Sequence, residues 1–300
     1  MDLADHLGQP GSLPGRGAGA AVKAAGGRMA DQLVVVHGAG TAGTGIADVL
    51  RQAMVRQGLA AEEATRRFWC LDRHGLLTDE HPGDLLDFQV PYARPAAEVA
   101  GWARTGPGEG IPLAEVVARV HPTMLLGTST QAGAFTEQVV REMAAHVERP
   151  VIMPLSNPTS RAEAAPADLI RWTDGRALVA TGSPFDPVGF EGTTYQIAQA
   201  NNALVFPGVG LGVTVARARR LSDGMLAAAA DAVAGLSDAA RRGAPLLPPV
   251  DDLRLVSARV AIAVAEAAAA EGLAQVDLHD PARQVHQGMW RPEYPRVEPV

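Results

Sequence analysis

Short apolar runs alternate with helical patterns between residues 32 and 180 of the chain. The first run, Leu33–Val36, is rich in β-branched residues, which is typical of a strand buried on both faces of a parallel sheet. After a glycine turn, apolar side chains recur at helical spacing over residues 46–57. The alternation continues with predicted strands at 68–71, 123–126, 151–153 and 177–180 and predicted helices at 113–120, 135–146 and 167–171.

The order of these elements predicts both a fold and a domain organisation. Strands that alternate with helices are joined by right-handed crossovers and form a parallel sheet with helices on both faces. We therefore expect an α/β protein with a doubly wound, Rossmann-type parallel sheet over residues 31–220. Residues 1–30 are rich in glycine and alanine and predict a poorly ordered lead-in, with a short helix near residues 18–25.

The last third of the chain has a different pattern, in which helices follow one another without strands. Predicted helices cover residues 209–219, 224–233 and 253–270. Residues 281–300 hold four prolines and show no period, so they predict an extended tail. Residues 221–300 are thus expected to form a helical extension with a proline-rich tail, packed on the sheet domain.

Composition narrows the possible partners. Hydrophobic residues make up 47% and charged residues 20% of the chain, as in an ordinary globular protein. The net charge of −7 argues against nucleic acid and against an anionic membrane surface, because both attract basic faces. Cys70 is the only cysteine, which excludes an internal disulfide, and we expect it to be buried on a strand. Neither a secretory signal nor a membrane span is recognisable, so the cytoplasm is the expected location.

A glycine motif directly follows the first predicted strand. Residues 38–43 match the pattern GxGxxG, and an amphipathic helix comes next, which is the context of a dinucleotide-binding turn. Gly38 would make the tight turn, Gly40 would let the backbone approach a pyrophosphate, and Gly43 would let helix and strand pack closely. The anion would lie on free amides at the positive end of the helix dipole. The expected contacts are Gly38, Gly40, Thr41, Ala42 and Gly43.

An acidic residue at the end of the second strand is the expected partner of this turn. Asp72 ends the run 68–71 and would accept hydrogen bonds from the adenosine ribose. It comes later than the usual distance of roughly 20 residues after the glycines, so the intervening segment must be longer. Arg73 could meet the 2′-phosphate of NADP, whereas Asp72 would repel it. Both cofactors stay open, with NAD favoured over NADP.

Several further runs carry a family resemblance. Residues 38–45, 135–137, 156–160, 182–188 and 201–208 resemble, in order and spacing, the cofactor domain of malic enzymes. The resemblance covers roughly residues 30 to 300. Malic enzymes oxidise L-malate with NAD or NADP and a divalent metal, and then decarboxylate the product to pyruvate. Malolactic enzymes, which release lactate, share the same cofactor domain.

The resemblance also implies roles for particular polar residues. Asn157 would contact the nicotinamide ribose and malate, and Asn202, with Asn201, would hold malate's carboxylate and the nicotinamide amide. Asparagine suits these positions because its amide offers a donor and an acceptor without adding charge near a hydride transfer. Thr128 and Ser129, which follow a predicted strand, would lie in the loop over the cofactor.

The chain departs from the family pattern upstream of the glycine turn. In malic enzymes that region supplies a catalytic lysine, a catalytic tyrosine and the carboxylates that hold the metal. Here Lys23 is the only lysine, and Asp2 and Asp5 are the only acidic residues before Asp31. We therefore expect no catalytic residue and no metal ligand in this chain, with Mn or Mg bound only if the missing half is supplied.

Three hypotheses follow for the function. The first is an NAD(P)-binding domain of a malic-enzyme-like oxidoreductase, incomplete and inactive as a catalyst alone. The second is a non-catalytic dinucleotide-binding module or truncated paralogue, and the third is part of a malolactic-type enzyme. The expected partners are a nicotinamide dinucleotide, L-malate or pyruvate bound weakly, and either a second copy of the chain or a missing N-terminal half.

Overall fold

The computed structural model describes residues 18–19, 21–22, 24–81, 84–105, 110–237 and 239–290. The chain divides into two compact units, one with residues up to 202 and residues 234–250, the other with residues 203–233 and 251 onward. The sequence pattern had placed a boundary at residue 220. The break comes earlier because the helix that begins at Phe206 packs with the later helices. The functional division of the chain at residue 220 stays a prediction.

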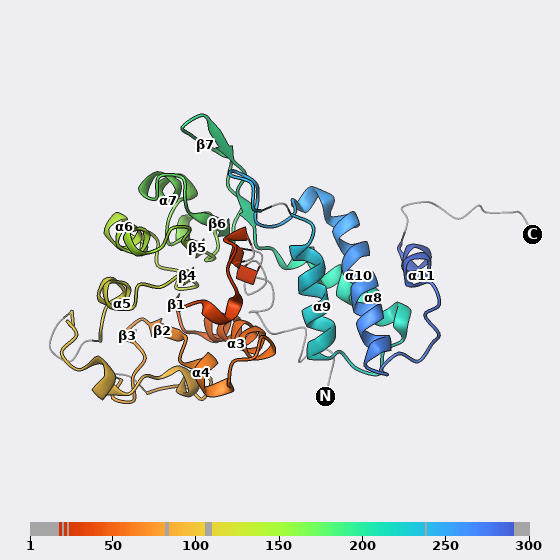
Figure 1. The fold of residues 1–300 in the computed structure, drawn as a ribbon, viewed down its shortest axis with the longest axis horizontal. Helices are drawn as coiled ribbons and strands as arrows, with labels where there is room; N and C mark the ends of the chain where they lie inside the picture. Colours follow the sequence, from red (N-terminus) through yellow and green to blue (C-terminus); the bar gives the residue numbers. More distant parts are fainter. Residues whose placement is uncertain are drawn as a thin grey trace, which may run out of the picture. The chain divides into compact units, whose positions relative to one another are not determined.

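The larger unit is built on a seven-stranded sheet with the order β3-β2-β1-β4-β5-β6-β9 (Figure 1). All neighbours are parallel except β3, which runs antiparallel to β2 at one edge. The predicted Rossmann-type α/β fold is confirmed, with the two short outer strands as additions. The strands are β1 (Val34–His37), β2 (Phe68–Asp72), β3 (Gly75–Leu76), β4 (Met124–Gly127), β5 (Val151–Pro154), β6 (Leu178–Thr181) and β9 (Ala198–Gln199).

Helices cover both faces of this sheet. Alternate strand residues, such as Val35, Leu125 and Ile152, share one core with α5, α6 and α7, and α3 packs against the opposite face of β1, where Gly43 lies close to Val36 (Figure 1). Cys70 is buried on β2 as expected, and this burial raises the pKa of its thiol. The helices are α3 (Thr41–Arg56), α4 (Ala61–Thr65), α5 (Leu113–Val120), α6 (Glu137–His146) and α7 (Pro166–Trp172).

A β-hairpin that the sequence pattern did not predict lies between β6 and β9. Its strands β7 (Val188–Phe190) and β8 (Thr193–Tyr195) are antiparallel. The turn residues Glu191 and Gly192 have φ angles of 46° and 73°, as in the type I′ turns that match the twist of hairpin strands. Strands of three residues are too short to show a period, which is why the pattern missed them.

The smaller unit is helical, as predicted. Its helices α8 (Phe206–Ala216) and α10 (Leu253–Ala270) pack closely because glycines face the partner helix. A Cβ on Gly208 would lie 2.6 Å from the Cβ of Val260. The unit also holds most of α9 (Asp223–Ala234) and α11 (Pro281–Gly288).

The predicted extended tail is wrong for its first part. Residues 281–288 form α11, whose N-cap residue Asp280 accepts a hydrogen bond from the amide of Arg283 at 3.0 Å. Aspartate at the N-cap followed by proline at the first helical position is a helix-start signal, which the high proline content concealed. Residues 291–300 lie outside the described residues.

Two further expectations concern the chain start and membranes. The described positions between 18 and 24 are helical and largely buried, which agrees with the short helix predicted near residues 18–25. Residues 1–17 and Lys23 lie outside the described residues. In the part of the chain that is described, no helix combines the length and the apolar character needed to cross a membrane.

Candidate functional site

The residues predicted to bind ligand follow the carboxyl ends of parallel strands. Gly38 follows β1, Asp72 ends β2, Thr128 follows β4, Asn157 lies beyond β5, and Asn201 lies beyond β9. Since these strands are parallel, their carboxyl ends share one edge of the sheet. This is the edge at which open α/β sheets bind ligands, next to the switch point where β2 and β4 lie on opposite sides of β1.

Packing explains two of the three motif glycines. Gly38 has a φ of +111°, and a Cβ there would lie 2.4 Å from the backbone carbon of Thr128. A Cβ on Gly43 would lie 2.2 Å from the carbonyl oxygen of Gly38. The hydroxyl of Thr128 donates to that same carbonyl at 2.7 Å. The turn, the helix and the β4 loop therefore fit together only when both positions lack a side chain.

Gly40 differs from these two glycines because there is room for a side chain at its position. It is the N-cap of α3, with φ −79° and ψ −173°, and a Cβ on it would meet no atom of the described residues within 4 Å. The first hydrogen bond of the helix runs from the amide of Thr44 to the carbonyl of Gly40 at 3.0 Å. The amides of residues 41–43 precede that bond, and such amides at a helix start are free to bind an anion. Open space and free donors coincide here.

A cavity of about 660 Å³ lies beside the turn, at the ends of β1 and β2 and between α5 and α6. Asp72 lines it, and its contact with an adenosine ribose stays a prediction. Its Oδ1 accepts hydrogen bonds from the amide of His74 at 2.7 Å and from Nε2 of His81 at 3.1 Å. Both bonds use the same oxygen, so among the described residues Oδ2 is left available for a ligand hydroxyl.

Arg73 also lines this cavity and is exposed. Its Nε donates to Nε2 of His74 at 2.9 Å. A cation and a carboxylate therefore border the same cavity, so the choice between NAD and NADP stays open from the geometry of these two side chains.

His37 is a cavity residue that the sequence reasoning missed. It is the last residue of β1, only 8% exposed, and its Nε2 lies 3.3 Å from Oε1 of Gln131. Its Nδ1 is buried and has no hydrogen-bond partner among the described residues. Burial lowers the pKa of this imidazole, which keeps it neutral near pH 7. The available signal was a single polar residue between an apolar strand and the glycine turn.

The loop after β4 is held by protein groups. The amide and the hydroxyl of Ser129 both donate to Oε1 of Glu163, at 2.8 Å and 2.9 Å. Glu163 is fully buried and was not singled out by the sequence reasoning, because it is a lone acidic residue among small ones. The predicted contacts of Thr128 and Ser129 with a cofactor stay predictions.

The predicted asparagines lie at the far end of the same edge. Oδ1 of Asn157 accepts a hydrogen bond of 2.6 Å from the hydroxyl of Ser183, which follows β6. Asn201 and Asn202 come after β9, and Asn202 begins a short 3-10 helix and is exposed. Their contacts with nicotinamide or malate stay predictions.

A possible metal-binding group lies at the opposite edge. Among the described residues, His121, Glu142 and His146 are the one group of three potential ligands close together. They lie at the C-terminal ends of α5 and α6, before β4 and β5 begin. The centroids of the two imidazole rings lie 3.6 Å apart, and the ring planes meet at an angle of 12°. This group is separate from the candidate site.

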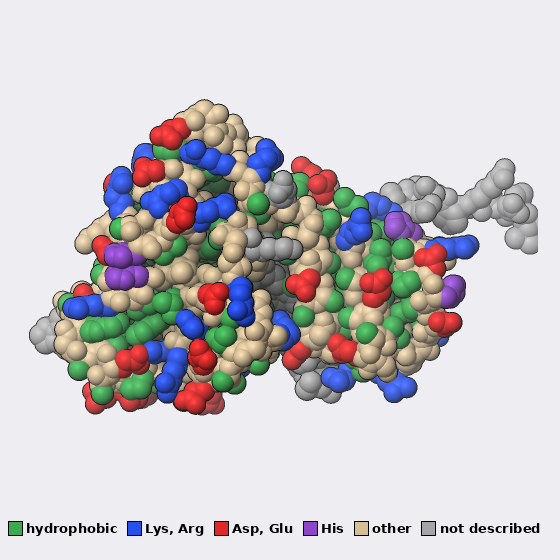
Figure 2. Space-filling view, in the orientation of Figure 1, with side chains coloured by type: hydrophobic (Ala, Val, Ile, Leu, Met, Phe, Trp, Pro, Cys, Tyr) green, Lys and Arg blue, Asp and Glu red, His purple; other side chains and the backbone are tan. Residues whose placement is uncertain are grey.

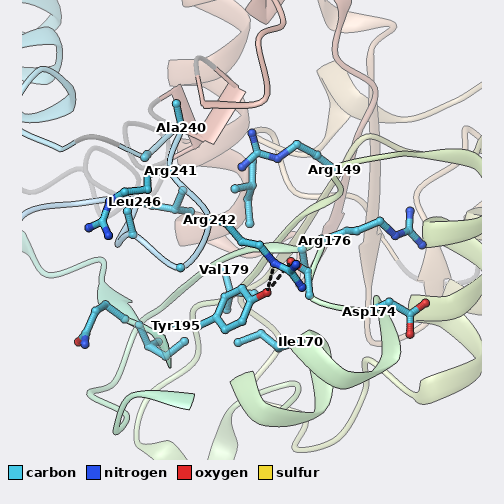
Figure 3. A pocket seen from close by; sticks show the side chains of 18 of the residues that line it. Arg149, Ile170, Asp174, Arg176, Val179, Tyr195, Ala240, Arg241, Arg242 and Leu246 are labelled. Atoms are coloured by element: carbon cyan, nitrogen blue, oxygen red, sulfur yellow. Dashed lines mark hydrogen bonds between the residues drawn. The ribbon is translucent and has the colours of Figure 1, made fainter. Parts of the chain in front are cut away.

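A second cavity, of about 410 Å³, also lies at that opposite edge, near the starts of β5 and β6 (Figure 3). Arg149, Arg176 and Arg242, which line it, form hydrogen bonds within the protein. Nε of Arg242 donates to the hydroxyl of Tyr195 at 2.7 Å, and Arg176 donates to carbonyls at the end of α6. More broadly, Figure 2 shows basic and acidic side chains interspersed, without a basic face on the visible side.

Comparison with known proteins places this geometry in a family. Residues 14–269 match the family model described as malic enzyme, NAD binding domain. The chain is 55% identical over 272 residues to the NAD-dependent malic enzyme 3 of Bacillus subtilis, covering 91% of this chain and 48% of that protein. It is 50% identical over 267 residues to a putative malate oxidoreductase (NAD) of Mycobacterium tuberculosis, covering 89% and 48%. The chain thus spans about half the length of these curated relatives.

Solved structures agree with respect to the fold. The malic enzyme from Pyrococcus horikoshii superimposes with a TM-score of 0.68 at 23% identity, covering 93% of this chain and 57% of that one. The malic enzyme of Entamoeba histolytica gives a TM-score of 0.67 at 22% identity, covering 93% and 51%. The resemblance seen in the sequence motifs is confirmed: the chain belongs to the malic enzyme family and contains its NAD binding domain.

Proposed function

We propose that the chain binds NAD along the C-terminal edge of its sheet, with the pyrophosphate on the start of α3. The observation that carries the proposal is the coincidence of open space at Gly40 with the free amides of residues 41–43. The adjoining cavity has the polar groups that an adenosine needs. Asp72 and His37 both line it.

Each part of the dinucleotide would meet different residues. The amides of residues 41–43 hold the pyrophosphate, and Asp72 accepts hydrogen bonds from the adenosine ribose. Asn157, fixed by Ser183, orients the nicotinamide ribose and a small substrate beside it. Bound NAD supplies the hydride acceptor, and the protein contributes binding and orientation. NADP is the alternative cofactor, with Arg73 as the cation for its 2′-phosphate.

The complete reaction is proposed only for an enzyme that combines this domain with the part present in its longer relatives. The relatives carry the name NAD-dependent malic enzyme, and the chain matches about half of their length. We propose that an enzyme built on this domain oxidises L-malate and decarboxylates the product to pyruvate with Mn or Mg. The described residues at the sheet edge do not offer a set of metal ligands, so no step is assigned to a metal here. Asn157, Asn201 and Asn202 would bind malate or pyruvate weakly.

Calorimetric titration with NAD and NADP tests the binding proposal. We expect saturable binding with a one-to-one stoichiometry, and a higher melting temperature at saturation, because a ligand that binds only the folded state stabilises it. A signal with NAD that exceeds the signal with NADP would identify the cofactor. The absence of heat and of thermal stabilisation with both nucleotides would refute the proposal.

The activity of the chain alone is tested separately. With malate, NAD and manganese, we expect no NADH formation above background. The reason is that the family's lysine base and metal ligands are not expected in this chain. A general base alone typically accelerates a reaction by about 10²–10⁴-fold, and charge stabilisation by a metal contributes several kcal/mol more. Malate-dependent NADH formation by the chain alone, lost on Lys23→Ala, would contradict this expectation and make Lys23 the base.

A further inference from the structure

Glu163 places a buried carboxylate under the loops that follow two neighbouring strands. It lies between β5 and α7 and is 0% exposed. Its Oε1 accepts hydrogen bonds from the amide of Ser129 (2.8 Å), the hydroxyl of Ser129 (2.9 Å) and the hydroxyl of Ser156 (2.5 Å). Its Oε2 accepts a longer one from the amide of Ser156 at 3.4 Å. Ser129 follows β4 and Ser156 follows β5, so one side chain joins both loops.

This arrangement constrains the loops because a buried charge requires its partners. Moving a carboxylate out of water is costly unless hydrogen bonds replace its hydration. The donors to Glu163 are all neutral, so among the described residues hydrogen bonds rather than an ion pair hold the charge. Such charge-assisted hydrogen bonds are about twice as strong as neutral ones. Displacing either loop would remove donors from the carboxylate.

The network continues from Glu163 to the cavity beside the glycine turn. The hydroxyl of Ser156 accepts from the amide of Thr130 at 2.8 Å, which fixes a residue whose φ is +57°. The hydroxyl of Ser129 accepts from the amide of Gln131 at 3.1 Å. Oε1 of Gln131 then lies 3.3 Å from Nε2 of His37. Hydrogen bonds that lead back to Glu163 therefore hold the loop after β4 at several positions.

The lack of a side chain at Gly127 leaves the space that the carboxylate of Glu163 occupies. This glycine ends β4, and a Cβ on it would lie 2.5 Å from the carboxyl carbon of Glu163. Any other residue at position 127 would displace the carboxylate from the donors. The close approach of the two residues therefore belongs to the same arrangement.

We propose that Glu163 is a positioning residue for the nicotinamide half of the cofactor. The inference rests on the proposed function. A dinucleotide spans the switch point of the sheet, so with its adenosine over β1 and β2, its other half lies over β4 and β5. Glu163 holds the loops of those two strands, which include Ser129 and lead into Asn157. Neither Glu163 nor its direct partners Ser129 and Ser156 line the adenosine cavity, which the network reaches only indirectly through Gln131.

The test compares Glu163→Gln with the wild-type chain in binding NAD and AMP. Glutamine keeps the size of the side chain but replaces an acceptor oxygen by a donor and removes the charge. We expect NAD to bind about tenfold or more weakly, and AMP to bind within about twofold of wild type. An equal loss for both ligands, or no loss for either, would overturn the proposal.

Two controls separate positioning from general damage. Glu62→Gln removes a carboxylate from an exposed ion pair with Arg66, and Met143→Ala opens the core at the far end of α6. Both should leave the ratio of NAD to AMP affinity unchanged. A change of that ratio in Met143→Ala as large as in Glu163→Gln would refute a specific role. Ser156→Ala, which breaks the same network more mildly, should shift the ratio in the same direction if Glu163→Gln does not fold.

Amide hydrogen exchange measures the positioning without any nucleotide. In the wild-type chain the amides of Ser129 and Thr130 are hydrogen-bonded, so they should exchange slowly. In Glu163→Gln their exchange should accelerate about tenfold or more relative to amides of β4. Unchanged exchange would overturn the role of Glu163 even if NAD binds. Accelerated exchange in a chain that binds no NAD would instead refute the proposed function and leave the loop anchoring intact.

Discussion

Replacing Gly40 by valine adds a branched side chain where the protein itself leaves open space. In the described part of the chain, no atom lies within 4 Å of the position that a Cβ would take, and the backbone angles there are ones that valine adopts readily. The fold should therefore accept the substitution. The added methyl groups would instead occupy the space through which a pyrophosphate approaches the amides of residues 41–43.

The two expected magnitudes differ in scale. Glycine is a better N-cap than valine, so the free energy of unfolding should fall by about 1 kcal/mol, which lowers the melting temperature by about 2–4 °C. A hydrogen bond to a charged group is worth about 1.5–3 kcal/mol. Losing even one such bond weakens the affinity for NAD by about tenfold or more, and losing two removes measurable binding.

Calorimetry with NAD and a thermal melt of the same sample measure both effects. Gly45→Ala, inside the same helix but beyond its first turn, is a matched control that should bind NAD like wild type. NAD binding by Gly40→Val with an affinity within twofold of wild type would refute the placement of the pyrophosphate. A large drop in melting temperature would show that the space at Gly40 is needed by the fold itself.

Three further predictions concern neighbouring residues. Gly43→Ala should destabilise the fold by about 1–3 kcal/mol in denaturant unfolding, because its Cβ would lie 2.2 Å from the carbonyl oxygen of Gly38; an unchanged midpoint would contradict this. Asp72→Ala should weaken the binding of NAD more than that of NADP, and Arg73→Ala should weaken only the binding of NADP. An unchanged ratio of the two affinities in both variants would place the ribose elsewhere. Burial lowers the pKa of His37, so between its folded pKa and the ordinary value near 6.5 the unfolded chain binds more protons. Stability should therefore fall as the pH drops below about 6.5, and His37→Asn should flatten that slope in unfolding experiments from pH 8 to 5.

The sequence predicted those elements whose signals are local. Residues 113–120 and 253–270 form helices with the predicted bounds, and the apolar runs form the parallel strands. The helix α3 begins at Thr41 instead of residue 46. Gly43 lowers the helix propensity of the first turn, which hid the helix start from the sequence pattern, and close packing against Gly38 requires glycine at this position. Local propensity thus explains the correct bounds, and tertiary packing explains the shifted one.

The candidate site divides in the same way. The glycine turn and Asp72 were recognisable because a motif and a strand end define them within a short stretch. His37 and Glu163 were not, because their roles depend on contacts between distant positions. His37 meets Gln131 across 94 residues of sequence, and Glu163 meets Ser129 across 34. Only folding of the sheet brings such pairs together, and no periodic pattern records them.

The return of residues 234–250 to the sheet unit makes that unit discontinuous along the chain. The amide of Gln196 donates to the carbonyl of Gly243, and Arg242 pairs with Tyr195, so this late segment supports the strands around β8. A shortened protein that stops at residue 202 would lack this support even though it keeps every strand of the sheet. The ribosome must therefore synthesise all of α8 and α9 and the segment up to residue 250 before the sheet unit can be completed. Minimal dinucleotide-binding fragments should retain residues 234–250, joined through the intervening helices or supplied as a separate peptide.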